Sequence, residues 1–247
     1  MDSSHSSQPK KSASSRSECQ FKLYSTFVDP TSLVFDVGAN VGNRIQALLW
    51  CGARIIAVEP QPDCIQILKE TYRSNRQVVI VESAAGRSCG EANLFRARAV
   101  DPAASLSEEF ITKTRKSGRF AKRKYNKQIL VKVLTLDSLI EAYGHPKFIK
   151  LDVEGYEENV LSGLSKGTDV LSFEWTPELF EQASACMGRC ETLGMPCFQI
   201  SFYETMRFEL PISIHRRTME NMVRSLANNK ILFGDIYASK VPLRRGL

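Results

Sequence analysis

The sequence predicts an α/β protein built on a mostly parallel sheet with helices on both faces. The first observation is an alternation of short apolar or β-branched runs with amphipathic segments, which begins near Leu33 and returns after His145. The second is that runs such as VVIVES (78–83) are apolar at successive positions. Strands have this composition when both faces of a parallel sheet are buried. Together the two observations favour a Rossmann-like, doubly wound sheet in one domain, residues 21–247.

Local signals then place the elements in order. A glycine closes the first expected helix, a proline and an aspartate open the second, and residues 90–100 look like an edge strand. A strand that feeds a helix follows at 129–139. The remaining strands are expected at 32–37, 54–60, 78–83, 147–155, 170–175, 197–203 and 231–238, and the remaining helices at 43–52, 62–75, 156–167, 176–190 and 216–229.

Two segments fall outside this rhythm. Residues 1–20 are rich in serine and lack the apolar centre of a secretory signal, so we expect a disordered tail, with an organellar transit peptide as the alternative. Residues 97–128 form a basic insertion on the sheet, and its part 113–128 carries eight of the 33 Lys and Arg and no acid. The net charge of +6 therefore comes from one local feature on a mildly acidic body.

The cysteines and the hydropathy bear on location. Seven cysteines, an odd number scattered along the chain, favour reduced thiols and a cytoplasmic protein. Cys186 and Cys190 are spaced as neighbours on one face of a helix, which favours small apolar packing residues over metal ligands. No apolar run approaches the ~18 residues of a membrane span, so we expect none.

The stretch DVGANVG, residues 36–42, indicates a ligand at the carboxyl edge of the sheet. Gly38 permits positive φ or close backbone approach, Gly42 lets a ligand or the following helix come near, and Asn40 offers a donor and an acceptor between them. Glu59 closes the next strand, where an acidic side chain accepts hydrogen bonds from ribose hydroxyls. Because Asp36 would repel a pyrophosphate and attract a sulfonium, the pattern favours S-adenosyl-L-methionine over a dinucleotide.

The motifs DVGANVG, AVEP, SAAGRSCGEANLF, VKVLTLDSLI, FIKLDVEGYEENVLSGL and LSFEW, in this order and spacing, resemble the FkbM family of S-adenosylmethionine-dependent methyltransferases over about residues 31–176. The resemblance implies the class I methyltransferase fold, with a seven-stranded sheet whose last two strands form an antiparallel edge hairpin. It also implies an acceptor hydroxyl on a sugar or another small metabolite. The cofactor contacts that it implies are Asp36, Gly38, Asn40 and Glu59, with Ser83 and Ala84 near the adenine.

Asp152 and Glu154 are the candidate catalytic residues. Methyl transfer needs donor and nucleophile aligned in a dry site, and a hydroxyl nucleophile also needs a base. If the strand persists, the two carboxylates point to one side, and their repulsion raises the pKa of at least one toward that of a useful base. The alternative is that Asp152 caps the next helix or anchors the cofactor. Lys150 could neutralise the pair, Glu174 is a further edge carboxylate, and nothing in the spacing specifies a metal site.

The sequence therefore favours an enzyme that methylates oxygen of a small or carbohydrate-like acceptor. Segment 113–128 admits three interpretations: a solvated loop, a lid that attracts an anionic acceptor, or a guide for methylation of RNA or protein. Its two aromatics are few for stacking of RNA bases. A non-catalytic nucleotide-binding module is the other alternative, and the retained acidic side chains argue against it.

Overall fold

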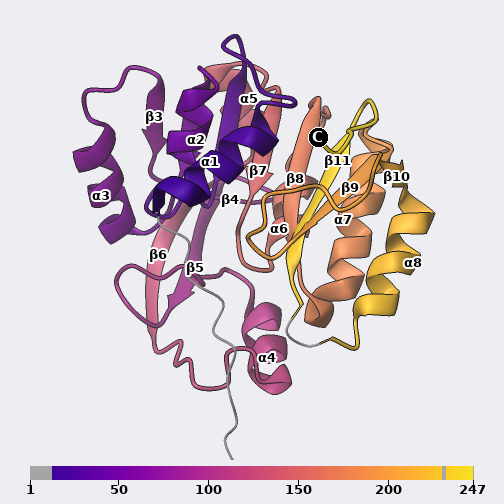
Figure 1. Ribbon diagram of the computed structural model, residues 1–247. Helices are drawn as coiled ribbons and strands as arrows, with labels where there is room; N and C mark the ends of the chain where they lie inside the picture. Colours follow the sequence, from indigo (N-terminus) through magenta and orange to yellow (C-terminus); the bar gives the residue numbers. More distant parts are fainter. Residues whose placement is uncertain (1–12, 230–231, 247) are drawn as a thin grey trace, which may run out of the picture.

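The computed structural model describes residues 13–229 and 232–246, and its centre is an eight-stranded sheet (Figure 1). Five neighbouring strands, β3, β2, β1, β7 and β8, run parallel, and β11 lies antiparallel between β8 and β9. The predicted α/β class with a mostly parallel sheet is confirmed. In spatial order the strands are β10 (Ile214–His215), β9 (Cys197–Phe202), β11 (Gly234–Ser239), β8 (Val170–Trp175), β7 (Phe148–Leu151), β1 (Leu33–Val37), β2 (Arg54–Val58) and β3 (Val78–Val81).

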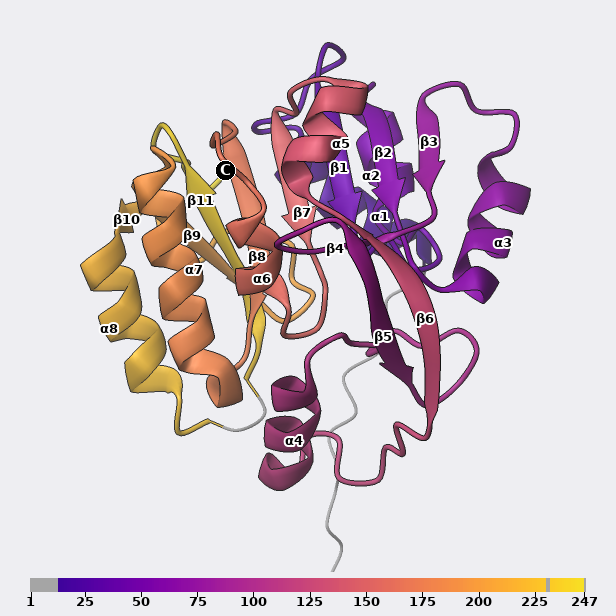
Figure 2. The same ribbon diagram turned by 180° about the vertical axis from the view of Figure 1, so that it is seen from behind.

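Helices cover both faces of this sheet because its strands are apolar on both sides (Figures 1 and 2). Successive residues of β1 show the division: Val34 belongs to the apolar cluster that includes residues of α1, α2 and α3, whereas Phe35 belongs to the cluster on the other face, with residues of α5, α6, α7 and α8. The helices are α1 (Ala13–Tyr24), α2 (Ile45–Trp50), α3 (Pro62–Tyr72), α4 (Glu108–Ser117), α5 (Leu136–Tyr143), α6 (Glu157–Ser162), α7 (Phe180–Thr192) and α8 (Arg216–Leu226), with a 3-10 turn, η1, at Pro177–Leu179.

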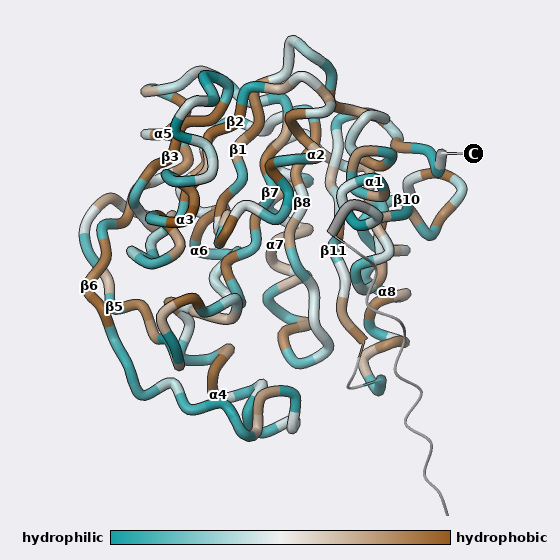
Figure 3. Tube along the Cα trace, turned by 60° about the vertical axis from the view of Figure 1, so that its left-hand side comes forward, coloured by the Kyte–Doolittle hydropathy of each residue, from teal (hydrophilic) through white to brown (hydrophobic). Residues whose placement is uncertain are grey.

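A second, three-stranded sheet projects from the carboxyl edge of the first. It consists of β4 (Ala84–Ala85), β6 (Lys127–Leu134) and β5 (Gly90–Arg96), and it stands beside α4 (Figure 2). The strand expected at residues 90–100 is β5, and it is an edge strand as predicted, but its sheet is this second one because β5 pairs with β6. The chain between α4 and β6 is hydrophilic, in contrast to the apolar central strands (Figure 3).

Two further expectations need correction. The sheet has eight strands and not seven, because the short strand β10 adds an outer edge to β9. β9 and β11 are antiparallel neighbours, as expected, but β10 and α8 intervene between them, so they do not form a hairpin.

The helix α1 occupies part of the N-terminal segment, residues 1–20, that was predicted to be disordered. Residues 13–20 belong to α1, so the prediction of disorder is wrong there, while residues 1–12 lie outside the described residues. The end of α1 is held by burial, since Leu23 and Tyr24 pack against the sheet and the ring of Tyr24 lies 5.6 Å from that of Phe148.

Four of the seven cysteines, Cys51, Cys64, Cys186 and Cys190, are buried packing residues. All seven are free thiols, and Cys186 and Cys190 are buried on the inner face of α7, as predicted. Within residues 13–229 and 232–246, none of the helices has the length and apolar character that crossing a bilayer requires.

Candidate active site

The turn after β1 is built around Gly38. Its φ is +83°, and a Cβ atom there would lie 1.9 Å from the carbonyl oxygen of Asp152. The Gly38 N–H donates to the carbonyl of Val58 at 2.9 Å. Only glycine fits, because the turn after β1 presses against the end of β7 while it is bonded to the end of β2. The absence of a side chain at Gly38 therefore lets the backbone of Asp152 pack directly against the turn.

Gly42 has a different role from the one expected of a cofactor contact. Its φ is +85°, and an added Cβ would meet the side chains of Leu68 and Tyr72 on α3 at 3.0 and 3.1 Å. A helix does come near Gly42, but the side chains closest to the added Cβ belong to α3 and not to α2, the helix that follows the turn. Gly42 does not line the cavity described below.

Glu59 directly follows β2, and its side chain lies against the turn that follows β1. Its two carboxylate oxygens accept hydrogen bonds from the backbone N–H groups of Asn40, at 2.8 Å, and Gln61, at 2.9 Å. Burial raises the pKa of Glu59 to about 7, against the lowering effect of these hydrogen bonds. Each oxygen has a second lone pair, so the carboxylate can still accept from two hydroxyl groups of a ligand.

Ser83 follows β3 on the same edge. Its side chain is buried, and its hydroxyl oxygen has no hydrogen-bond partner among the described residues. A buried hydroxyl without a partner is uncommon in proteins. Both Ser83 and its neighbour Ala84 line the cavity, as expected for residues that face a ligand.

These residues meet at a cavity of about 330 Å³ along the carboxyl edge. Most of the site residues predicted from the sequence line this cavity. It is also lined by residues that the sequence did not indicate, among them Arg44, Gln61, Asp101, Pro102, Leu106, Tyr203, Phe233 and Asp235. Three of the additions, Asp101, Pro102 and Leu106, come from the insertion. The predicted residues on its wall are Gly38, Asn40, Glu59, Ser83, Ala84, Asp152 and Glu154.

Asp36 lies behind the cavity wall and does not line it. It is buried, and neither of its carboxylate oxygens has a hydrogen-bond partner among the described residues. Burial raises the pKa of Asp36 to about 6, with Asp152 adding to the rise and the charges of Arg44 and Lys150 opposing it. From this position Asp36 can act on a ligand in the cavity through its charge, but its side chain does not reach the cavity surface.

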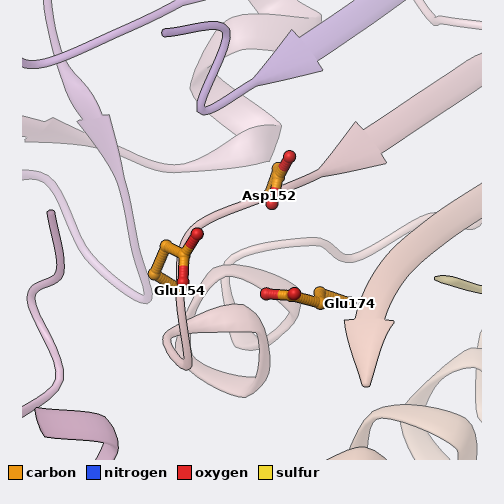
Figure 4. Close-up of side chains that lie close together, drawn as sticks. All are labelled: Asp152, Glu154 and Glu174. Carbon is orange, nitrogen blue, oxygen red and sulfur yellow. The ribbon is translucent and has the colours of Figure 1, made fainter. Parts of the chain in front are cut away.

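Three carboxylates gather where β7 and β8 end. One oxygen from each of Asp152, Glu154 and Glu174 lies within 4.8 Å of the others, and the side chains of Glu154 and Glu174 point toward one another (Figure 4). The strand does not persist as the sequence argument required, because β7 ends at Leu151 and Glu154 adopts a left-handed φ of 54°. Oxygen donors this close are also of the kind that Mg²⁺ or Ca²⁺ accepts.

The three carboxylates differ in charge. Burial opposes ionisation of Asp152, yet Lys150 and Arg44 hold its pKa below the usual value, and an Arg44 nitrogen lies 2.8 Å from its carboxylate. Burial raises the pKa of Glu154 well above the usual value, and Glu174 and Asp152 add to the rise. Burial likewise raises the pKa of Glu174 well above its ordinary value. Asp152 is therefore the ionised carboxylate of the three, whereas the surroundings of Glu154 and Glu174 favour their protonated forms.

Lys150 forms no hydrogen bond or ion pair with the three clustered carboxylates, Asp152, Glu154 and Glu174. Its ammonium is buried, donates to the carboxylate of Asp235 at 2.8 Å and to the carbonyl of Leu151 at 3.0 Å. Lys150 therefore acts on Asp152 through its charge, as the sequence suggested, while its hydrogen bonds tie β7 to β11.

The model of the methyltransferase FkbM domain matches residues 36–194. A search of the curated proteins finds no significant match.

Several solved structures are similar to the chain. A precorrin-6y C5,15-methyltransferase from Geobacter metallireducens is 14% identical, with 97% of this chain and 94% of that chain covered and a TM-score of 0.42. A precorrin 8w decarboxylase from Methanobacterium thermoautotrophicum is 12% identical, with 94% and 92% covered and a TM-score of 0.43. An rRNA methylase from Streptococcus thermophilus is 10% identical, with 94% and 99% covered and a TM-score of 0.41.

Proposed function

Because the chain belongs to the FkbM family of methyltransferases, we propose that it transfers a methyl group from S-adenosyl-L-methionine to an acceptor held in the cavity at the carboxyl edge. The observation that carries the proposal is the Glu59 carboxylate. It closes β2, lines the cavity, and is fixed by two backbone N–H groups that leave one lone pair on each oxygen for ribose hydroxyls.

The residues present fit this cofactor. Glu59 would hold the ribose, and the unpartnered hydroxyl of Ser83, beside Ala84, would face the adenine. Asn40 and Gly38 would form the wall at the turn, and Asp36 would act from behind it through its charge. When bound, the cofactor supplies a methyl group activated by a positive sulfonium, and the neighbouring carboxylates favour that charge.

Glu154 is the general base of the proposed reaction. Asp152 is a weak base because Arg44 and Lys150 stabilise its ionised form. Glu154 has a raised pKa and lines the cavity, so its ionised form can take the proton of an acceptor hydroxyl. Burial keeps that pKa high, and repulsion from Glu174, whose side chain points toward Glu154, adds to the rise.

The acceptor is a small, uncharged molecule with hydroxyl groups, such as a sugar. The carboxylates of Glu154 and Glu174 disfavour an anion and can accept hydrogen bonds from hydroxyls. Tyr203 and Phe233, whose rings lie 5.3 Å apart, add apolar surface to the same cavity. This lining does not support the anionic acceptor that the basic segment suggested.

RNA or protein methylation is the alternative acceptor class. Arg115, Lys116, Lys122 and Lys124 are exposed on the insertion and could contact a polyanion. Arg119 and Arg123 are engaged in internal ion pairs, however, which reduces the charge available to such a partner. The free thiols support the proposal of a cytoplasmic location.

The test is to incubate the protein with methyl-labelled S-adenosyl-L-methionine and fractionated cell extract. We expect label in small hydroxylated molecules, its loss with Glu154→Gln, and no loss with Glu181→Gln, which changes an exposed glutamate on α7. Label confined to RNA or protein would favour the alternative. No labelled fraction with any extract, from a folded protein, would contradict the proposed activity.

A further inference from the structure

The insertion closes a ring of hydrogen bonds around Glu59. The backbone amides of Asn40 and Gln61 hold the Glu59 carboxylate, and the side chains of the same two residues both reach the backbone of Asp101. Gln61 makes a reciprocal pair there: its amide nitrogen donates to the Asp101 carbonyl at 2.9 Å, and its amide oxygen accepts from the Asp101 N–H at 2.9 Å. Asn40 donates to the same carbonyl at 3.4 Å. A residue of the insertion thus completes the ring that positions Glu59.

Asp101 is in turn fixed by its own side chain. The carboxylate is fully buried and accepts from the backbone N–H groups of Ala97, at 2.6 Å, and Ala103, at 3.0 Å. These contacts fold residues 97–103 around Asp101. The remaining partner of the carboxylate is the guanidinium of Arg123. Two backbone donors and one cation therefore hold a buried charge that would be unfavourable alone.

The side chain of Arg123 also packs against two aromatic rings. Its guanidinium lies 5.4 Å from the ring centre of Phe120 and 5.6 Å from that of Tyr125, within the range of cation–π attraction. Only 19% of its side-chain surface is exposed, whereas its neighbours Lys122 and Lys124 are exposed. Arg123 is thus set apart from the exposed lysines of the basic segment 113–128.

The insertion is also attached to the rest of the protein at residues other than Asp101. The Ser105 hydroxyl donates to the backbone carbonyl of Glu154 at 2.6 Å. Arg119 forms a forked pair with Glu178, at 3.0 and 3.2 Å. Arg119 and Arg123 are therefore two ion-paired arginines of one insertion, of which only Arg123 connects to the ring around Glu59.

We propose that Arg123 is a positioning residue for the cofactor, acting through Asp101 and Gln61 on the carboxylate of Glu59. The proposal rests on the proposed function, since it concerns the same cavity. Without the guanidinium, the buried Asp101 carboxylate loses its counterion, residues 97–103 loosen, and the side chains of Asn40 and Gln61 lose their common acceptor. Cofactor affinity then falls, while the exposed lysines of the segment leave it unchanged.

The experiment compares Arg123→Ala with Lys124→Ala and Arg119→Ala by calorimetric titration with S-adenosylhomocysteine, the demethylated cofactor. We expect about a tenfold weaker affinity for Arg123→Ala, the usual size of coupling between linked sites, and a change under about twofold for both controls. Arg119→Ala removes a comparable ion pair of the insertion, so it reveals any effect of lost stability alone. The double variant Arg123→Ala with Gln61→Met should lose little more affinity than Gln61→Met, because both act on the same ring.

Equal affinities for Arg123→Ala and Lys124→Ala, or fully additive losses in the double variant, would overturn the positioning role. If Arg123→Ala does not fold, Arg123→Lys replaces it: a single ammonium cannot reproduce the planar fork between the two rings, and we expect about a threefold loss of affinity. Parental affinity in Arg123→Lys would then overturn the proposal. A parent protein that does not bind S-adenosylhomocysteine would instead contradict the proposed function.

Discussion

Cofactor affinity should depend on pH through Glu59. Burial raises the pKa of this carboxyl to about 7 in the free protein, from an ordinary value of 4.5. Only the ionised form can accept from both backbone amides and both ribose hydroxyls. The sign follows directly: raising the pH through about 7 strengthens cofactor binding, although the same ionisation destabilises the free fold relative to the unfolded chain.

The magnitude follows from the fraction of protein that is ionised at Glu59. With a pKa of about 7, that fraction is about 0.76 at about pH 7.5 and about 0.03 at about pH 5.5. The apparent dissociation constant therefore rises about 25-fold over this interval, equivalent to about 1.9 kcal/mol. Two other buried acids have pKa values near this range: Asp36, raised by burial to about 6, and Glu157, raised by burial to about 7. Asp36→Asn removes the contribution of Asp36, and Glu157→Gln that of Glu157.

The assay is calorimetric titration with S-adenosylhomocysteine from about pH 5.5 to about pH 7.5, in buffers of different ionisation enthalpy. We expect the weakening described above, together with proton release on binding at the acid end, and both should persist in Asp36→Asn. Glu59→Gln should bind weakly at every pH, because its amide N–H₂ faces backbone donors. An affinity for the parent protein that does not vary with pH, while circular dichroism shows it folded, would refute the role given to Glu59.

Three other predictions concern the carboxyl edge. Gly38→Ala should destabilise the fold by more than about 4 kcal/mol, because the new Cβ would lie 1.9 Å from the Asp152 carbonyl; urea unfolding measures this, with Gly246→Ala, where nothing lies within 4 Å, as the control. Glu154→Gln should reduce turnover by about 100-fold or more while S-adenosylhomocysteine affinity holds, and unchanged turnover would place the base elsewhere. Glu174→Gln should move the acid limb of the rate profile to lower pH, since Glu174 raises the pKa of Glu154; an unmoved limb would contradict the coupling.

Much of the fold could be predicted because its signals are local. Apolar runs that alternate with amphipathic segments follow from burying both faces of a parallel sheet, and Gly38 and Glu59 stand at the ends of their strands. The N-terminal helix was missed because its serine-rich start conceals the apolar end, where Leu23 and Tyr24 pack on the sheet. Strand β10 was missed because two residues carry no periodicity.

The candidate site was only partly predictable because it depends on long-range contacts. Asp101 lies in an irregular loop, where no pattern marks it, and its role appears only when Gln61 and Arg123 meet it in space. Glu154 lies near Asp152, as predicted, but the approach of Glu174 to Glu154 was not predicted. The i, i+2 spacing pointed to Asp152, but the left-handed turn at Glu154 directs its side chain toward Glu174.

A crystal structure of the protein with S-adenosylhomocysteine tests the central claim most directly, because that claim concerns where a ligand binds. We expect one molecule in the cavity at the carboxyl edge, with both ribose hydroxyls on the carboxylate of Glu59, the adenine beside Ser83 and Ala84, and the side chain of Gln61 still bonded to Asp101. A ligand bound away from Glu59, or a cavity that stays empty at saturating S-adenosylhomocysteine, would contradict it.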